Sequence, residues 1–509
     1  MDQRIKPAFS HHDFLARAGA AVILVAMGWW LPCHSRADGP YEGGVWLAGD
    51  HHIHTKYSPD GQYEIEAQVA KVRQYGLSWC VITDHGGPMH DKVALTYAYP
   101  ELVAARKKHP SMHVFQGLEW NIPAAEHGSV ILPPTPDEAM RIAEFEARFD
   151  QKNKSRENTP ADTEADAVRA LQYLQSMTPR PLFFVNHPAR TGRVSPTEFR
   201  NWSDAGPNVV RGFEGAPGHQ AATLVGHTRG EYSKKIKPDA WQGYPKESFK
   251  TWGGYDWYVA TVGGLWDSLL GEGRAWYITA NSDSHRHWTD ATIVDTSTYE
   301  THGHVTATDR KADHHDGDRD DNIDFFPGEY TKTWVYAASG SREAVLDALR
   351  HGNMFTVHGD LIDRLEFSAH AADAAAPMGG TLVLDKNDRD VEVRIRLRPA
   401  TGQNFGGGRP ILDHIDLIVG DILGPANDRE TIVNPTTRVV ARVPAKDLVK
   451  RGDWLVFHHR FDNVKNSFYV RIRGTNRDVQ APEMDGPKVN PWDDLWFYSN
   501  PIMVRAKLQ

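Results

Sequence analysis

Between residues 44 and 360, short apolar runs alternate with stretches of helical spacing, and several of the apolar runs end in a histidine or an acidic residue. The first such run, Val45–His54, closes on Gly-Asp-His-His-Ile-His. This alternation is typical of βα units around a parallel sheet or barrel. Because the carboxyl ends of barrel strands share one face, residues distant in sequence can meet there. The pattern therefore predicts an α/β fold with a polar site at one end.

The rest of this region shows the same alternation of apolar runs and helical spacing. Further apolar runs are predicted strands: Ser78–His85, His113–Glu119, Ser129–Leu132, Leu182–His187, Val210–Glu214, Ala275–Asn281 and Lys332–Ala337. Helical patterning covers Glu64–Tyr75, Arg141–Arg148, Ala165–Met177 and Ser341–Arg350. Gly76 stands where a helix C-cap is expected, and Ser341 is an N-cap without a full capping box. Residues 215–262 and 302–324 show no clear period and are predicted to be long loops on the side of the site.

After about residue 365 the pattern changes to alternating apolar and polar residues, as in VEVRIRLRP at 391–399 and FYVRIRG at 468–474. Such alternation predicts strands with one buried face. We therefore expect a barrel at 44–362 followed by a β-rich, sandwich-like domain at 365–509.

Composition limits the chemistry. The 509 residues include 26 His but only 2 Cys, so a bound metal must use imidazole and carboxylate ligands, and zinc ribbons or iron–sulfur sites are excluded. The formal net charge of −9 argues against a strongly basic surface, so nucleic acid is not the favoured partner. The expected partner is a small-molecule ester, and the sequence gives no oligomeric state.

The first 37 residues resemble a signal peptide. Lys6 and Arg17 give a basic start, Ala20–Leu31 is a short apolar run, and cleavage is expected after Ala37. The run is shorter than the roughly 20 residues that span a bilayer, so a permanent membrane anchor is not favoured. A periplasmic or secreted location follows. Removal of this segment leaves Cys80 as a lone thiol, which excludes an intramolecular disulfide.

Histidines and carboxylates at strand ends are the main candidates for a site. His52 and His54 lie two residues apart, so on an extended strand both point to the same side and can bind one metal ion. Asp283 and His285 repeat this spacing. Other candidates at or just beyond strand ends are Asp60, His85, Glu119, His127 and His187. A single His-x-His carries little weight in a chain so rich in histidine, but a series at successive strand ends indicates metal binding.

Taken in order, GDHHIHT, SPDG, ITDH, GLE, EHG, NHP and SDSH resemble the PHP family, named for polymerase and histidinol phosphatase domains. The resemblance covers roughly residues 44–360. It implies a distorted (β/α)7 barrel that hydrolyses phosphoesters with two or three divalent transition metal ions, of Zn, Mn, Fe or Co. The implied ligands are His52, His54, Asp60, His85, Glu119, His127, His187, Asp283 and His285. Asp60 is a departure, since many members have histidine there.

Four residues near these motifs are candidate substrate contacts. Trp120 and Trp288 could form an aromatic wall for an apolar ester group, although core packing is the alternative for any tryptophan. Arg190 and Arg286 could pair with phosphate oxygens, or could be solvated surface residues. In the segment 302–324, rich in His and Asp, an auxiliary metal site is the alternative to a solvated acidic loop.

The predicted reaction is ester hydrolysis by a hydroxide that bridges two metal ions. Glu119 is the best candidate for the bridging carboxylate, and His187 or His285 could bind or protonate the leaving alkoxide. A phosphodiester is preferred to a monoester because no dense Arg/Lys clamp for a dianion is evident. One alternative is a carbamate or carboxylester hydrolase with the same centre, since some long family members with a β-rich C-terminal part resemble carbaryl hydrolase. The other is a non-catalytic metal-binding module.

Overall fold

The structure is a computed structural model that describes residues 39–153, 162–232, 236–290, 292–294, 299–304, 310–312, 323–386 and 389–506. The predicted signal peptide and most of the 302–324 segment lie outside these ranges. Among the described residues, no helix has the length and apolar character needed to span a membrane.

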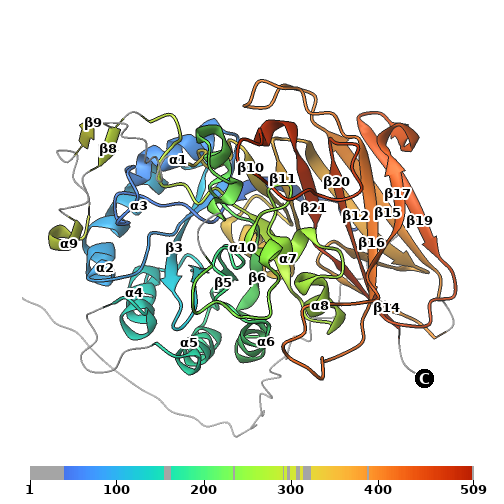
Figure 1. Ribbon diagram of the computed structural model, residues 1–509, viewed down its shortest axis with the longest axis horizontal. Helices are drawn as coiled ribbons and strands as arrows, with labels where there is room; N and C mark the ends of the chain where they lie inside the picture. Colours follow the sequence, from blue (N-terminus) through green and yellow to red (C-terminus); the bar gives the residue numbers. More distant parts are fainter. Residues whose placement is uncertain are drawn as a thin grey trace, which may run out of the picture. The chain divides into compact units, whose positions relative to one another are not determined.

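The barrel strands follow one another in the sheet in chain order. They are β1 (Val45–Asp50), β2 (Trp79–Ile82), β3 (His113–Asn121), β4 (His127–Ile131), β5 (Leu182–Val185), β6 (Val210–Ala216) and β7 (Tyr277–Ala280). Figure 1 labels β3, β5 and β6 among them. Strands β1 to β3 are parallel, as are β5 to β7, but β4 is antiparallel to both its neighbours. The short connection from β3 to β4 makes a hairpin, because a parallel crossover needs a dozen or more residues.

Two later strands extend this sheet on the other side of β1. Strand β10 (Thr331–Ala337) pairs antiparallel with β1, and β11 (Met354–His358) pairs antiparallel with β10. At the carboxyl ends, Ile53 forms an isolated parallel bridge with Ser284, and the N–H of His54 donates to the Ser284 carbonyl at 3.0 Å. This contact joins the first and last barrel strands and places their polar ends side by side.

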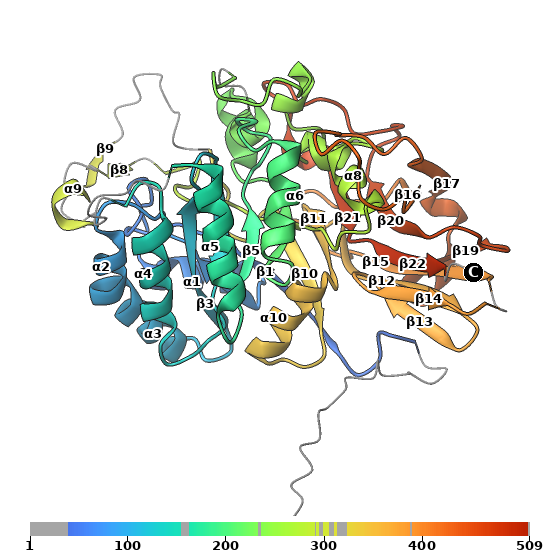
Figure 2. The same cartoon turned by 90° about the horizontal axis from the view of Figure 1, so that it is seen from below.

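Helices cover the outside of the barrel strands (Figure 2). The longer ones are α1 (Ile65–Gln74), α3 (Tyr99–Lys108), α4 (Glu138–Phe149), α5 (Glu164–Ser176), α6 (Pro196–Ala205) and α10 (Arg342–His351). The helices predicted at α1, α4, α5 and α10 are confirmed, and Gly76 follows α1 with φ of 79°. Helix α3 gave a weak signal because it buries only Leu102 and Ala105.

Shorter elements fill the connections. The short helices are α2 (His90–Val93), α7 (Trp257–Ala260), α8 (Leu265–Gly271) and α9 (Tyr299–His302), and β8 (Thr292–Val294) pairs with β9 (Arg310–Ala312). Single 3-10 or π turns are η1 (Ala94–Ala98), η2 (Gln220–Val225), η3 (Arg229–Glu231), η4 (Lys246–Phe249), η7 (Ala445–Asp447) and η8 (Pro491–Asp493). The described residues of 215–262 thus form short helical turns and loops between the end of β6 and α8.

The C-terminal region is antiparallel β structure apart from the parallel pair of β14 (Thr381–Leu384) and β22 (Ile502–Ala506). One sheet contains β12 (Ile362–Ala371), β13 (Ala374–Pro377), β15 (Val391–Pro399), β18 (Val449–Arg451) and β19 (Trp454–Phe461). The second contains β14, β22, β16 (His414–Asp421), β17 (Arg438–Pro444), β20 (Phe468–Thr475) and β21 (Trp496–Ser499). Apolar residues of both sheets share one buried cluster. The predicted α/β barrel with a sandwich-like β region is confirmed.

The second sheet is continuous with the barrel, because β21 pairs with β11. The boundary predicted between 362 and 365 therefore falls inside a structure in which one sheet serves both parts. The described residues belong to a single compact unit. The division into domains stays a prediction.

Candidate metal centre

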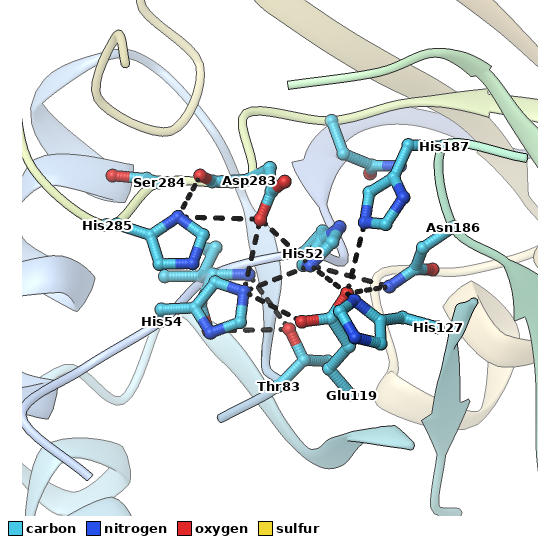
Figure 3. Close-up of polar contacts among 12 residues, drawn as sticks. His52, His54, Thr83, Glu119, His127, Asn186, His187, Asp283, Ser284 and His285 are labelled. Carbon is cyan, nitrogen blue, oxygen red and sulfur yellow. Dashed lines mark hydrogen bonds and ion pairs between the residues drawn. The ribbon is translucent and has the colours of Figure 1, made fainter. Parts of the chain in front are cut away.

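The structure brings together all nine residues that the sequence predicts as metal ligands. Seven of them are labelled in Figure 3: His52, His54, Glu119, His127, His187, Asp283 and His285. The nine residues come from the carboxyl ends of β1, β2, β3, β5 and β7, the amino end of β4, and the turn that holds Asp60. The set is His52, His54, Asp60, His85, Glu119, His127, His187, Asp283 and His285. The Asp60 side chain is half exposed, at 51%, whereas the side chains of the others are 17% exposed or less.

Glu119, near the carboxyl end of β3, contacts five histidines of this cluster and is 1% exposed. One carboxylate oxygen, Oε1, lies 3.1 to 3.3 Å from ring nitrogens of His52, His127 and His187. The other, Oε2, lies 2.8 Å from His85 and 3.3 Å from His54. A carboxylate whose two oxygens face two separate groups of histidines is arranged to bridge two cations.

His52 and His54 also contact a second carboxylate, that of Asp283. Their Nε2 atoms are 3.0 Å apart, and they lie 3.0 and 3.1 Å from Asp283 Oδ1. The Nδ1 atom of each ring is held by an oxygen, Glu214 Oε1 at 2.7 Å for His52 and Ser58 Oγ at 2.8 Å for His54. Metal-binding histidines are commonly fixed in this way, with one nitrogen hydrogen-bonded and the other directed at the ion.

A third group lies at the exposed edge of the cluster. Asp60 Oδ2 is 3.2 Å from His85 Nε2, and Asp60 Oδ1 is 3.5 Å from His285 Nε2. The rings of His54 and His285 stack with their centroids 3.8 Å apart. Asp60 therefore lies within reach of two of the implied histidine ligands, His85 and His285.

The backbone at two of these positions is strained. His187 has φ of 30° and Asp283 has φ of 48°, in the left-handed region that non-glycine residues seldom adopt. The backbone N–H of His187 donates to Glu214 Oε2 at 2.8 Å, and that of Ser282 donates to Asp50 Oδ2 at 2.9 Å. Such strain concentrates at functional sites, where surrounding contacts hold it in place.

The buried carboxylates favour positive charge among the histidines. Burial alone would lower the pKa of His85, but Glu119 and Asp60 raise it to about 10. Burial raises the pKa of Glu119, yet His85, His52 and His127 together bring it well below its usual range. His187 differs, since burial and the neighbouring Arg190 lower its pKa to about 3. A field of this kind suits bound cations.

The hydrogen bonding of the cluster also fits a metal centre. Glu119 Oε2, His85 Nδ1 and His127 Nδ1 are buried and lie at ion-pair distance from their neighbours, but none of them makes a contact with hydrogen-bond geometry among the described residues. Leaving such a group unsatisfied costs about 1 to 3 kcal/mol. Nitrogen and oxygen donors in this mixture match divalent transition metals, so the side chains present can hold the ions that the sequence predicts.

The model of the PHP domain family matches residues 50–171, which include the first six of the nine positions. Residues 50–171 of this chain thus match the PHP domain. The family resemblance predicted from the motifs is thereby confirmed. No curated protein matched the chain.

Two solved structures are similar to the PHP-domain chain. A two-domain protein containing a predicted PHP-like metal-dependent phosphoesterase, from Bacteroides vulgatus, is 15% identical with a TM-score of 0.33, over 89% of this chain and 96% of that one. A candidate metal-dependent phosphoesterase from Bifidobacterium adolescentis is 17% identical with a TM-score of 0.25, over 46% of this chain and 87% of that one.

Sequence reasoning missed several residues of the PHP-domain site. Glu214 binds the His52 ring, His219 Nε2 lies 3.0 Å from Asp283 Oδ2, and Glu126 groups with His127 and His187. A signal existed for two of them. Glu214 ends a predicted strand and His219 follows five residues later, so the rule that located the other ligands also applies to the end of β6.

The tryptophans predicted to contact substrate pack elsewhere. Trp120 is completely buried, its ring packs against Phe145 and Phe183, and its indole N–H donates to the Phe149 carbonyl at 2.9 Å. The prediction of an aromatic wall is wrong for Trp120, because its position on β3 faces the core and not the metal cluster. Trp288 is partly buried against the C-terminal core cluster.

The two predicted arginines also differ from each other. Arg190 Nη2 lies 3.0 Å from His187 Nε2, and Arg190 Nη1 lies 3.7 Å from Asp283 Oδ2, so its guanidinium contacts the cluster. Arg286 is 3% exposed and its guanidinium donates to the Asp290 carbonyl. Arg190 is therefore the better placed of the two to meet a substrate anion.

Proposed function

We propose that this protein is a metal-dependent phosphoesterase whose PHP-domain centre hydrolyses a small phosphodiester. The observation that carries the proposal is the position of Glu119, with one oxygen facing His52, His127 and His187 and the other facing His54 and His85. Two cations separated by a carboxylate are a recurrent arrangement in phosphoester hydrolysis.

The donor set assigns residues to each ion. His52, His54 and Asp283 would hold one ion with Glu119, and His85 and His127 a second with the same carboxylate. Asp60 and His285 would hold a third with His54 and His85, while His187 groups with Glu126 and His127. When bound, such ions lower the pKa of a shared water and offset the charge of phosphoryl oxygens.

The chain's own residues would orient and bind the substrate. Glu214 and Ser58 fix the rings of His52 and His54, so that their Nε2 atoms face the centre. Arg190, beside His187 and Asp283, lies where its guanidinium can pair with a phosphoryl oxygen. Burial lowers the pKa of His285, but Asp60 and Asp283 raise it to about 9, so His285 remains our candidate to protonate the departing alkoxide. His187, with its lowered pKa, could only bind it.

The cationic side chains near the cluster favour a diester. Lys56 is held by Glu64 and Glu101, and Arg193 by Asp239 at 2.7 Å, so carboxylates already occupy both. A monoester dianion carries more negative charge than a diester monoanion. Arg190 is the cationic side chain described above that contacts implied metal ligands, His187 and Asp283. A monoanionic phosphodiester therefore matches the charge of this site better.

The test compares substrates with one leaving group. The full-length protein is reconstituted with Mn²⁺ or Zn²⁺, and turnover of bis(p-nitrophenyl) phosphate is compared with that of p-nitrophenyl phosphate. We expect a higher kcat/KM for the diester. Faster monoester turnover would overturn the diester preference. Turnover of aryl carbamates or carboxylesters with none of phosphates would instead favour the alternative hydrolase, and no turnover of any ester would favour a non-catalytic metal-binding module.

We further propose that residues 1–37 direct export, with cleavage after Ala37 and a periplasmic or secreted product. The support is the basic start, the apolar run of Ala20–Leu31 and the small residues before the expected cleavage point. The mass of the protein recovered from its native host tests this, since an intact N-terminus would contradict it.

A further inference from the structure

His219 lies outside the nine residues implied by the family resemblance, yet its ring enters the same cluster. It follows β6, has φ of 57° and is 7% exposed. Its Nδ1 lies 2.5 Å from Asp324 Oδ1, and its Nε2 lies 3.0 Å from Asp283 Oδ2. Donor atoms of His219, Asp283 and His285 lie within 4.8 Å of one another.

The surroundings of His219 repeat those of His52 and His54. In all three rings Nδ1 is held by an oxygen, from Asp324, Glu214 and Ser58 respectively, while Nε2 is directed at Asp283. The distances from Nε2 to the Asp283 carboxylate are 3.0 or 3.1 Å in each case. His219 thus has the geometry of a metal ligand with its second nitrogen held by a carboxylate.

Asp324 holds more than the His219 ring. Its second oxygen, Oδ2, accepts the backbone N–H of His285 at 2.6 Å and that of Arg286 at 3.0 Å. Asp324 is completely buried. One carboxylate therefore fixes both the His219 ring and the backbone that carries His285.

The backbone strain of His219 supports the same conclusion. His187 and Asp283, both implied ligands, have positive φ, and His219 is a third non-glycine residue of the cluster with this conformation. A strained backbone that brings an imidazole into a cluster persists only where surrounding contacts hold it, and it is frequent at functional sites.

We propose that His219 is a tenth protein ligand of the metal centre, on the Asp283 side, oriented by Asp324. The proposal rests on the metal-dependent function proposed above. With this ligand, each of the parallel strands β5, β6 and β7 is followed by a metal ligand. None of the nine implied positions follows β6.

The first test measures metal binding without reference to activity. Metal-free His219→Gln protein is titrated with Mn²⁺ and Zn²⁺, and bound metal is counted by elemental analysis. Loss of a hydrogen bond to a ligand typically weakens metal binding 10- to 100-fold, so we expect loss of a ligand to weaken it by at least about 10-fold. Asp324→Asn should have a smaller effect in the same direction. Unchanged metal content and affinity in His219→Gln would overturn the proposal.

His90→Gln is the matched control. His90 is also buried and also pairs with a carboxylate, its Nδ1 lying 2.9 Å from Glu146 Oε2, but it is in none of the groups that can hold a metal ion among the described residues. The control should bind metal as the wild type does. Circular dichroism and melting of the metal-free forms show whether either variant has lost its fold.

A second variant gives a signal that a purely structural role would not produce. In His219→Cys a thiolate replaces the imidazole, and thiolates favour soft metals such as Cd²⁺. With Cys33 replaced by Ser in both proteins, we expect a Cd²⁺-dependent ultraviolet charge-transfer band in this variant and none in the wild-type background, whose remaining Cys80 is buried. Absence of the band in folded, Cd²⁺-loaded His219→Cys would overturn the proposal.

Failure of this proposal is distinguishable from failure of the proposed function. If the wild type binds metal and hydrolyses esters while His219→Gln retains full metal content and affinity, only the tenth ligand is wrong. If the wild type binds no transition metal under any condition, the proposed function itself fails.

Discussion

Buried charged and polar side chains gather in two regions of the protein, and their partners differ between the two. Where the C-terminal strands contact the barrel, Arg471 of β20 donates to both oxygens of Asp267 of α8, at 2.9 and 2.7 Å, with both side chains fully buried. Arg473 and Asp416 form a neighbouring pair at 3.0 Å. In these pairs each buried charge meets its opposite, so the protein supplies both partners.

In the metal centre, not every buried polar atom has a complementary hydrogen-bond partner among the described residues. The Nε2 atoms of His52 and His54 approach to 3.0 Å, and Glu119 Oε2 has no hydrogen bond among the described residues. Burying polar groups that face like groups is costly unless another partner intervenes. A self-sufficient ion pair, Arg471–Asp267, thus fastens the C-terminal region to the barrel, whereas the arrangement of the centre fits completion by bound ions.

The largest effect on activity should come from removing the metal ions that we propose for the centre. Extraction with a chelator should abolish ester hydrolysis, and re-addition of Mn²⁺ or Zn²⁺ should restore it. Glu119→Gln should lower kcat/KM by more than about 100-fold and reduce bound metal, because it removes the charge between two ions. Metal analysis and steady-state rates measure both. A Glu119→Gln enzyme with full metal content and near-normal rates would contradict the bridging role.

The ion pair at the C-terminal contact should respond to removal of one partner but not of both. Asp267→Leu should destabilise the fold by about 3 to 5 kcal/mol, since it leaves Arg471 buried without a counter-charge. The double variant Asp267→Leu/Arg471→Met should recover most of this loss. Denaturant unfolding measures both. Equal destabilisation by the single and double variants would show that the pair is not self-contained.

A smaller effect is expected where a carboxylate acts on the centre through a histidine. Glu214→Gln should weaken metal binding about 10- to 100-fold, because Glu214 fixes the His52 ring and the His187 backbone. Glu366→Gln is the control, since Glu366 pairs with Arg396 on the C-terminal sheet. Titration with metal tests the difference, and similar affinities for the two variants would argue against the orienting role.

The smallest effect should follow loss of an exposed pair. Glu144 and Arg148 are about half exposed and face each other one turn apart on α4. Arg148→Ala should change stability by no more than about 0.5 kcal/mol, because solvent screens such pairs. A loss of several kcal/mol would mean that burial is not what separates the clusters compared above.

The local patterns of the chain anticipated much of this architecture. The strands that carry Glu119 or precede His52 and His187 lie where their apolar runs indicated, because a short apolar run bounded by polar residues marks a buried strand regardless of its partners. The antiparallel direction of β4 was not predicted, since Ser129–Leu132 reads the same in either direction. Trp120 was misplaced because sequence does not say which face of β3 meets the core.

The sequence by itself determined the class of fold and the kind of donor atoms, since strand periods are local and two cysteines leave imidazole and carboxylate as the ligands. Only the tertiary structure decided that Glu119 presents one oxygen to each group of histidines, and that His219 and Asp324 join Asp283. Apart from Glu119–His127, these contacts join residues far apart in the chain, from 34 positions for His85–Glu119 to 105 for His219–Asp324. They depend on how the strand ends converge when the barrel closes, which no local pattern specifies.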